Sequence, residues 1–599
     1  MEPDPVRKTY VDLREKNEVL LASLKKRQLF ISLLRLLVFI AGGILSAVAF
    51  GNSVISGIFG LLITVFIFLI LIVEFGRCSN KIIITENLIR INRNEINALD
   101  CDFSAFDGGT DRIDMNHDFS NDIDLFGEDS LFRYLNRTVT GSGRSLLAAW
   151  LSEPIDLREE IMERQEAVME LSGKLTWRQG FMACGLNKPL DENEIKSLNE
   201  WLNGRENFFS SGYMKLIAWM LPVAGIVILL LVITGILPLL VFILVCVFNL
   251  LLIGIFLKRS NRIHSMVSQK HSFLASVEQL VRSFDKEHFK SSFLTSTQKK
   301  LCTQQDSVAD KIKELNNVIK AFDSRLNLFV GFIFNALLLW DFHCILRLEK
   351  WRRPAASNLP GWLSLLGKID ALNSLANYAY NNPGHAYPQI INGGPVMEAL
   401  SLGHPLLKRE IRIYNDFSIP HKGLIFIITG ANMAGKSTFL RTVAVNMVLA
   451  MTGAPVCAEK MSLSPIRLFT SMRTTDSLSH NESYFYAELK RLKILKERLE
   501  KGETIFFILD EILKGTNSTD KSLGSKLFLR RVIELGGTGL IATHDISLGD
   551  MEKEFPENVV NKCFEIEIDG ESISFDYLLR DGITRKMNAA ALMKQMGIA

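Results

Sequence analysis

Residues 424–438, Leu-Ile-Phe-Ile-Ile-Thr-Gly-Ala-Asn-Met-Ala-Gly-Lys-Ser-Thr, decide the fold of the C-terminal part of this 599-residue chain. An apolar run typical of a buried strand leads into Gly-x-x-x-x-Gly-Lys-Ser, and the residues that follow read as a helix. The glycines let several backbone N–H groups point at one anion, and the helix N-terminus adds partial positive charge. The pattern predicts that Lys436 reaches the β- and γ-phosphates of a nucleotide and that Ser437 ligates Mg²⁺. The alternative is a glycine-rich turn without a ligand.

Two further strand ends oppose that alternative. The apolar run 504–509 ends in Asp510 and Glu511, and the short run 539–542 leads to His544. An aspartate at such a strand end can hold Mg²⁺, and the neighbouring glutamate can orient or deprotonate the attacking water. In open α/β folds, ligands bind at the carboxyl edge of the sheet, where His544 would sense the γ-phosphate. The order of the three motifs predicts an ATPase domain.

These residues resemble one family specifically. Residues 429–438, with the Asn432-Met433 pair, resemble the P-loop of the MutS family of DNA mismatch-repair ATPases. Residues 509–518 resemble its Walker B strand and the loop beyond, and 542–545 its switch histidine. Residues 481–489 are similar to its Ser-Thr-Phe-x-x-Glu segment, with tyrosine in place of threonine.

The resemblance implies a dimer with composite sites for ATP and Mg²⁺. Ser483 would reach the ATP of the other protomer, and Ser437 and Asp510 would hold the metal. The implied catalytic residues are Glu511, His544 and Lys436, and the implied nucleotide-binding residues are Gly430, Asn432, Met433, Ala434, Gly435, Lys436, Ser437, Thr438 and Ser483.

Two apolar blocks earlier in the chain predict transmembrane hairpins. Residues 29–50 and 54–73 form the first and residues 216–236 and 237–257 the second, and each run has the roughly 20 residues that a bilayer span needs. A cleaved signal peptide does not fit the first block, because a second apolar run follows at once. The alternative for the second block, a pair of buried core helices, is opposed by its near-continuous apolarity. Basic residues flank the inner ends, as the positive-inside rule requires: Lys25, Lys26, Arg27, Arg77, Lys81, Lys215, Lys258, Arg259 and Arg262.

Four spans in two hairpins predict a multi-pass protein of the bacterial inner membrane with its ATPase domain in the cytoplasm. Residues 326–340 are apolar but short and include Asn327 and Asn335, so a core helix is favoured over a fifth span. Eight scattered cysteines without a Cys-x-x-Cys pair fit a reducing compartment. The aspartate-rich residues 100–124 favour a solvated linker over a metal site, because they lack EF-hand spacing.

The predicted fold class is an α/β P-loop ATPase domain of the ABC-like type, preceded by an all-α core and lever domain, with two transmembrane helical hairpins. Residues 135–144 and 150–154 resemble the opening of the MutS core, and 403–407 resemble the start of its ATPase domain. The expected divisions are a cytoplasmic N-terminal segment (1–28), the first hairpin (29–75), a cytoplasmic linker (76–117), the first core helices (118–213), the second hairpin (214–257), further core and lever helices (258–390) and the ATPase domain (391–599).

The function inferred is ATP hydrolysis coupled to lever motion in a membrane-anchored dimer, with DNA as a partner implied by the resemblance. Several features depart from mismatch-repair proteins. A hairpin and a linker stand where the mismatch-reading domain is expected, and the chain stops at Ala599 without the family's C-terminal extension. The net charge of +3 argues neither for nor against binding of nucleic acid. No basic cluster interleaved with aromatic residues indicates a DNA-binding surface. The alternative is a transport or membrane-remodelling ATPase, although Arg35 and Asn249 are the main polar residues in the spans. An anchored scaffold with a degenerate site is disfavoured by the intact motifs.

Overall fold

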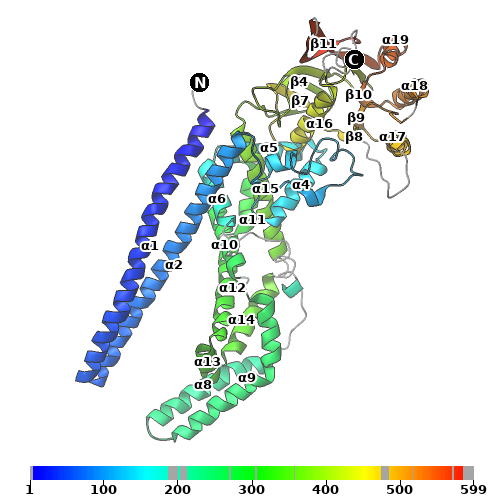
Figure 1. The fold of residues 1–599 in the computed structure, drawn as a ribbon. Coiled ribbons are helices and arrows are strands. Elements are labelled where there is room, and N and C mark those ends of the chain that lie inside the picture. Colours follow the sequence, from blue (N-terminus) through cyan, green and yellow to red (C-terminus); the bar gives the residue numbers. More distant parts are fainter. Residues whose placement is uncertain are drawn as a thin grey trace.

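The computed structural model of the chain describes residues 4–186, 200–202, 212–268, 271–303, 306–355, 358–473, 484–515, 517–569 and 572–584. Within these ranges the chain forms a helical hairpin, a long helical part that carries a second hairpin, and a C-terminal α/β part (Figure 1). The tips of both hairpins lie at the end of the molecule that is farther from the α/β part (Figure 1).

The first hairpin consists of two helices of unusual length, α1 (Pro5–Asn52) and α2 (Val54–Leu99). Asp4 caps α1 by accepting a hydrogen bond from the Val6 N–H. Ser53 separates α1 from α2 and caps α2 by accepting a hydrogen bond from the Ser56 N–H. The apolar halves next to Ser53 leave most of their large side chains exposed. Four helices of the described residues, namely α1, α2, α8 (Gly212–Ile233) and α9 (Leu239–Val267), are long and apolar enough to cross a membrane.

The first turns of α1 are packed into the helical part of the chain. The Tyr10 side chain is fully buried, and its hydroxyl donates a 2.7 Å hydrogen bond to Oδ1 of Asn381. Arg7 forms a bidentate pair with Asp100, just beyond the end of α2. The ends of α1 and α2 that lie away from Ser53 are therefore tied to the body of the protein. Residues 76–99, expected as part of a linker, instead continue α2 to Leu99.

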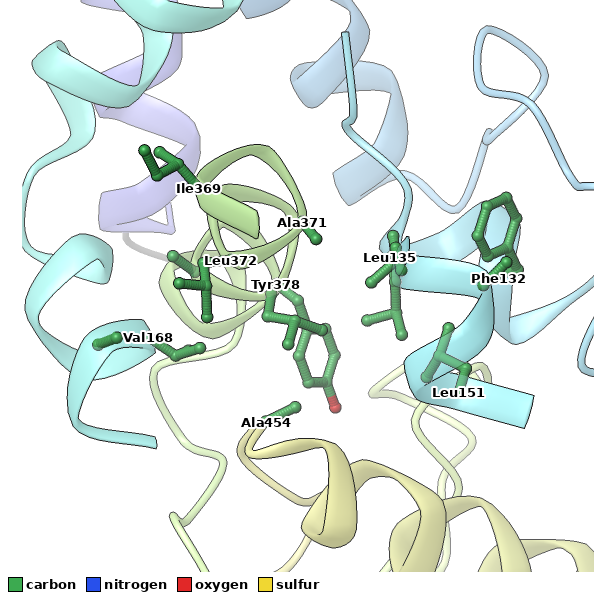
Figure 2. Packing of buried hydrophobic residues seen from close by; sticks show 14 of the residues in the cluster. Phe132, Leu135, Leu151, Val168, Ile369, Ala371, Leu372, Tyr378 and Ala454 are labelled. Atoms are coloured by element: carbon green, nitrogen blue, oxygen red, sulfur yellow. The ribbon is translucent and has the colours of Figure 1, made fainter. Parts of the chain in front are cut away.

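The long helical part is built around α15 (Leu359–Asn381), whose face toward the core is almost fully buried. Figure 2 shows Leu372 and Tyr378 of α15 among Leu135, Val168 and Ala454, which belong to the same apolar cluster. The other helices are α3 (Leu131–Leu135), α4 (Gly141–Ser152), α5 (Arg158–Ser172), α6 (Leu175–Gly185), α10 (His271–Asp285), α11 (Ser292–Leu301), α12 (Val308–Asp323), α13 (Leu328–Leu338) and α14 (Trp340–Ala355), with a two-stranded ribbon of β1 (Cys302–Thr303) and β2 (Asp306–Ser307).

One short helix, α13, differs from the expectation for residues 326–340. It is helical, but it is not a core helix, because Phe329, Phe332 and Ile333 are 82%, 63% and 49% exposed. It packs on α8 and α9 of the second hairpin. Apolar composition alone could not distinguish a side chain in a protein core from one on this surface.

The α/β part contains a six-stranded sheet in the order β12-β11-β6-β10-β9-β8. Strands β6, β10, β9 and β8 are parallel neighbours with both faces covered, which explains their continuous apolar runs. The bounds are β6 (Ile425–Gly430), β8 (Arg467–Ser471), β9 (Ile505–Asp510), β10 (Thr538–Thr543), β11 (Val559–Asp569) and β12 (Ser572–Asp581), with helices α16 (Lys436–Thr452), α17 (Tyr484–Glu500), α18 (Ser518–Glu534) and α19 (Met551–Glu554). A second sheet has the order β3-β7-β4-β5, from β3 (Gln389–Ile390), β4 (Met397–Leu402), β5 (Asn415–Ile419) and β7 (Lys460–Leu463). Strands β11 and β12 pair antiparallel at one edge of the six-stranded sheet.

The aspartate-rich segment before α3 is docked on the α/β part and is not a solvated linker along its whole length. Asp122 is buried and accepts hydrogen bonds from the Thr470 hydroxyl (2.5 Å) and from the N–H groups of Met472 (3.1 Å) and Arg473 (2.8 Å). Asp124 binds the Arg473 guanidinium. The expectation failed because these partners lie some 350 residues away in the sequence, beyond the reach of a local pattern.

Candidate nucleotide-binding site

The phosphate loop follows β6 and ends at the first residue of α16. Gly435 has a φ of 99° and Met433 a φ of 65°, so the loop curls through the left-handed region just before the helix begins. A side chain at Gly435 would also meet the Tyr577 ring at 2.9 Å. The first residue of α16 is Lys436, so the unpaired N–H groups of the helix N-terminus face the same space as the loop.

The Lys436 ammonium group lies over the loop. Its Nζ atom donates to the carbonyl oxygens of Gly430 (2.8 Å) and Ala431 (3.0 Å) and lies 3.4 Å from the His544 ring. Burial lowers the pKa of Lys436 to about 8, although the charges of Glu511 and Asp510 act in the opposite direction. A cation held in a partly buried loop is a strong partner for phosphate oxygens.

The three strand ends meet as the sequence predicts. Thr543 of β10 pairs with Thr429 of β6, and Ala542 pairs with Asp510 of β9, so the residues that follow these strands lie at one edge. The Ser437 hydroxyl donates a 2.6 Å hydrogen bond to Oδ2 of Asp510. Two oxygens of these types, placed together beside a phosphate loop, form a donor set that fits Mg²⁺.

Glu511 lies beside Asp510 with a φ of 52°, a conformation that few non-glycine residues adopt. Its Oε1 atom is 2.6 Å from Nε2 of His544, and its Oε2 atom is 3.6 Å from Nζ of Lys521. Burial would raise the pKa of Glu511, but His544 and the neighbouring lysines lower it to about 2. The carboxylate is therefore ionised and oriented and can accept a proton, and the lowered pKa also makes it a weaker base than an ordinary glutamate.

Hydrogen bonds to the side chain of Glu488 in α17 fix the loop after β9. This side chain is 3% exposed, and its carboxylate accepts hydrogen bonds from the N–H groups of Leu513 and, at 3.1 Å, Lys514. Burial raises the pKa of Glu488, against the effect of those two hydrogen bonds. Glu488 belongs to the family-like segment 481–489 that also includes Ser483, but that resemblance assigns it no role. Ser483 itself lies outside the described residues.

A cavity of about 670 Å³ opens between the phosphate loop, residues 402–415 and β12. Every expected phosphate-loop residue from Asn432 to Thr438 lines it, together with Asp510, Glu511 and His544. Gly430 lies at the end of β6, beneath the loop.

The wall of this cavity that lies opposite the phosphate loop is apolar, and the sequence did not predict it. Leu407, Ile411, Ile413 and Tyr577 form this wall. Asn415 fixes β12 there, because its Nδ2 atom donates to the Tyr577 carbonyl and its Oδ1 atom accepts from the Leu579 N–H. No local motif marks these residues, because they come from two distant segments that meet only in the fold.

The chain matches two domain models along most of its length. Residues 113–418 match the model described as MutS domain III, and residues 426–598 match MutS domain V. The DNA mismatch repair protein MutS of Thermotoga petrophila is 30% identical over 236 residues, which are 39% of this chain and 29% of that protein. The proteins of the same name from Persephonella marina and Finegoldia magna are 32% identical over 238 residues and 33% identical over 229 residues. These matches cover 39% and 37% of this chain and 27% and 26% of the relatives, so the chain spans less than a third of their length.

Proposed function

The chain belongs to the MutS family, and we propose that it is a membrane-anchored ATPase in which ATP hydrolysis drives motion of the helical part. The observation that carries the proposal is the meeting of Lys436, Ser437, Asp510, Glu511 and His544 at one sheet edge, around a cavity large enough for a nucleotide. The donor set fits a magnesium nucleotide: a buried ammonium group, a hydroxyl and a carboxylate side by side, and a helix N-terminus.

The roles of the residues follow from their positions. Backbone N–H groups of residues 432–438 and the Lys436 ammonium group bind the phosphates, and the apolar wall with Tyr577 receives the adenine. Ser437 and Asp510 would hold Mg²⁺, which neutralises charge on the β- and γ-phosphates. Glu511 accepts a proton from the attacking water, and His544 orients that carboxylate and lies 3.4 Å from the lysine that reaches the γ-phosphate.

The dimer and the membrane anchor are parts of the same proposal. Ser483 from a second copy of the chain would close over the γ-phosphate, as the family segment around it implies. Helices α1, α2, α8 and α9 would form the four spans, because their apolar stretches are exposed and each helix is longer than the hydrocarbon core of a bilayer is thick. Both hairpin tips lie at the same end of the molecule, as one bilayer requires (Figure 1).

DNA is the proposed ligand of the moving part, since the relatives are named as DNA mismatch repair proteins. The test is the ATPase rate of the detergent-solubilised protein with and without duplex, mismatched and branched DNA. We expect stimulation by at least one of these, lost in Lys436→Ala. Basal hydrolysis that is indifferent to every DNA would reject DNA as the ligand, and it would favour a remodelling ATPase whose hairpins are the working part. Absence of hydrolysis in the wild-type protein would reject the ATPase assignment itself.

A further inference from the structure

The helix α13 joins the ends of α12 and α14 that lie farthest from the six-stranded sheet (Figure 1). Its exposed side chains are almost all large and apolar: Phe329, Phe332, Ile333 and Phe334 are all exposed, as is Leu326 just before it. An exposed aromatic cluster of this density is unusual on a surface that faces water. Because α13 packs on α8 and α9, its apolar surface continues that of the second hairpin.

The helix is too short to cross a bilayer. It has 11 residues, which extend about 16 Å, whereas the hydrocarbon core is about 30 Å thick. The chain bends by 110° between the helical segments before and after residue 327, so α12 and α13 do not form one straight span. Gly331 permits this bend, because a side chain there would meet the Arg325 carbonyl oxygen at 2.5 Å.

The chain before α13 and the chain after it return to the same residue of α9. Arg325 donates to the Ser260 hydroxyl at 3.0 Å, and that hydroxyl donates to Oδ2 of Asp341 at 3.1 Å. The Arg325 guanidinium also pairs with Asp341, which is fully buried. Ser260 lies just after Lys258 and Arg259, where α9 changes from apolar to polar. The residues that flank α13, Arg325 and Asp341, are therefore fixed at one level, beside the cationic boundary of the hairpin.

Side chains cap the backbone of α13 at both ends, which favours a helix in an environment with little water. At its start, the Asn327 side chain accepts from the N–H groups of Phe329 and Val330. At its end, Asn335 accepts from the Asp341 N–H at 2.9 Å. Asn249 of α9 donates to the Ala336 carbonyl at 2.8 Å. Asn249 lies in the apolar part of α9, about 13 Å before Lys258 along the helix axis.

We propose that α13 is a re-entrant helix whose exposed face contacts the acyl chains of the cytoplasmic leaflet, while the tips of α12 and α14 end at the membrane boundary. The partner is lipid because the face continues two candidate spans, because its length fits one leaflet, and because a polar amide of a span caps its last turn. The half-buried Trp340 packs on Phe334 of α13, and Trp219 of α8, 66% exposed, packs on His343 of α14. Tryptophan is enriched at membrane interfaces. The inference rests on the proposed membrane anchoring. It implies that motion of α12 and α14 is transmitted through α13 directly to the bilayer.

Site-specific photocrosslinking in the full chain tests the proposal. A benzophenone amino acid replaces Phe332, and the protein is reconstituted in vesicles of phosphatidylethanolamine and phosphatidylglycerol. Phe59 of α2 is the matched position on a proposed span, and Leu400 of β4 is an exposed apolar position on the α/β part. After irradiation, intact-protein mass spectrometry records the adducts, and the unchanged ATPase rate of each variant shows that it is folded.

We expect phospholipid adducts at Phe332 and Phe59 and none at Leu400. Lipid at Phe59 but not at Phe332 would overturn the re-entrant helix and leave the anchoring intact. A crosslink from Phe332 to a second copy of the chain would overturn it in favour of a dimer contact. Absence of lipid at both positions would reject the anchoring itself. Asn249→Leu, which removes the amide that caps α13, should reduce the lipid adduct at Phe332 and leave that at Phe59 unchanged; equal yields would remove Asn249 from the argument and count against a helix fixed at that depth.

Discussion

Glu511 and His544 are joined across the edge of the sheet, with Oε1 of the glutamate 2.6 Å from Nε2 of the histidine. One residue follows β9 and the other follows β10, and parallel pairing of these strands sets their separation. The contact orients the carboxylate toward the space beside Lys436, where the γ-phosphate would lie. It also links the proposed base to a residue that lies 3.4 Å from Lys436, the proposed phosphate-binding lysine.

Glu511→Gln should retain ATP binding and lose most turnover. The amide has nearly the same shape but cannot accept a proton, so the rate should fall by about 10²-fold or more. Binding of a fluorescent ATP analogue and steady-state phosphate release measure the two effects separately. Glu459→Gln, at an exposed position of the same domain, is the control and should behave as wild type. Normal hydrolysis by Glu511→Gln would contradict the assignment of Glu511 as the general base.

Mixing two inactive variants should restore activity if Ser483 acts in the other protomer. Lys436→Ala cannot hold the phosphates but supplies an intact Ser483, whereas Ser483→Ala has the reverse defect. After random exchange, half of the dimers are mixed and each has one intact site, so we expect about a quarter of the wild-type rate. Each variant alone should remain inactive. An equimolar mixture with no gain over the separate variants, despite exchange of subunits, would place Ser483 outside a composite site.

Asp122→Ala should weaken the docking of the segment before α3 on the α/β part. The change leaves the buried N–H group of Met472 and the partly buried N–H group of Arg473 without their acceptor, which costs about 2–3 kcal/mol. Thermal unfolding in detergent should show a lower midpoint, and limited proteolysis should cut near residue 122 sooner. Asp102→Ala, at an exposed position of the same segment, should change neither measurement. Equal midpoints for the two variants would mean that Asp122 does not hold this interface.

Acid should destabilise the protein partly through His385. Burial, followed by the positive charges of Arg412 and Arg409, lowers the pKa of His385 to about 3. As pH falls below about 6.5, the unfolded chain takes up a proton there that the folded chain does not, so the free energy of unfolding falls. The stabilisation is present above that pH and is lost progressively down to about pH 3.

The measurement compares denaturant unfolding at pH 7 and pH 5. His385→Gln should reduce the difference between these two conditions by about 2 kcal/mol at most. His421→Gln, at an exposed position, should leave it unchanged. If His385→Gln keeps the full acid sensitivity of the wild type, this histidine is not its source.

The sequence predicts the phosphate loop and the two strand ends because each is a local pattern. Residues 430–438 form a curled loop and the start of a helix, and the residue types that favour both features are adjacent in the sequence. The spacing along the chain does not matter for Asp510 and His544, because parallel strands bring their carboxyl ends to one edge whatever the connection between them.

The parts that were missed depend on contacts between distant segments. The apolar wall with Tyr577 needs residues from β12 and from the loop before β5, and Asp122 needs partners after β8. The prediction that residues 326–340 form a core helix was wrong for another reason. Phenylalanine is favourable both in a protein core and in contact with lipid, so the sequence alone does not distinguish the two environments, and the arrangement of the neighbouring helices does.

The hydrogen bond between Tyr10 and Asn381 joins residues that are 371 positions apart. A ribosome that adds 5–20 residues per second needs roughly 20–75 s to make the second residue after the first. During that interval the start of α1 emerges without the surface on which it will pack. If the first hairpin spans the membrane as proposed, its insertion would precede completion of the core, and the nascent N-terminus would wait for α15 beside an already inserted hairpin.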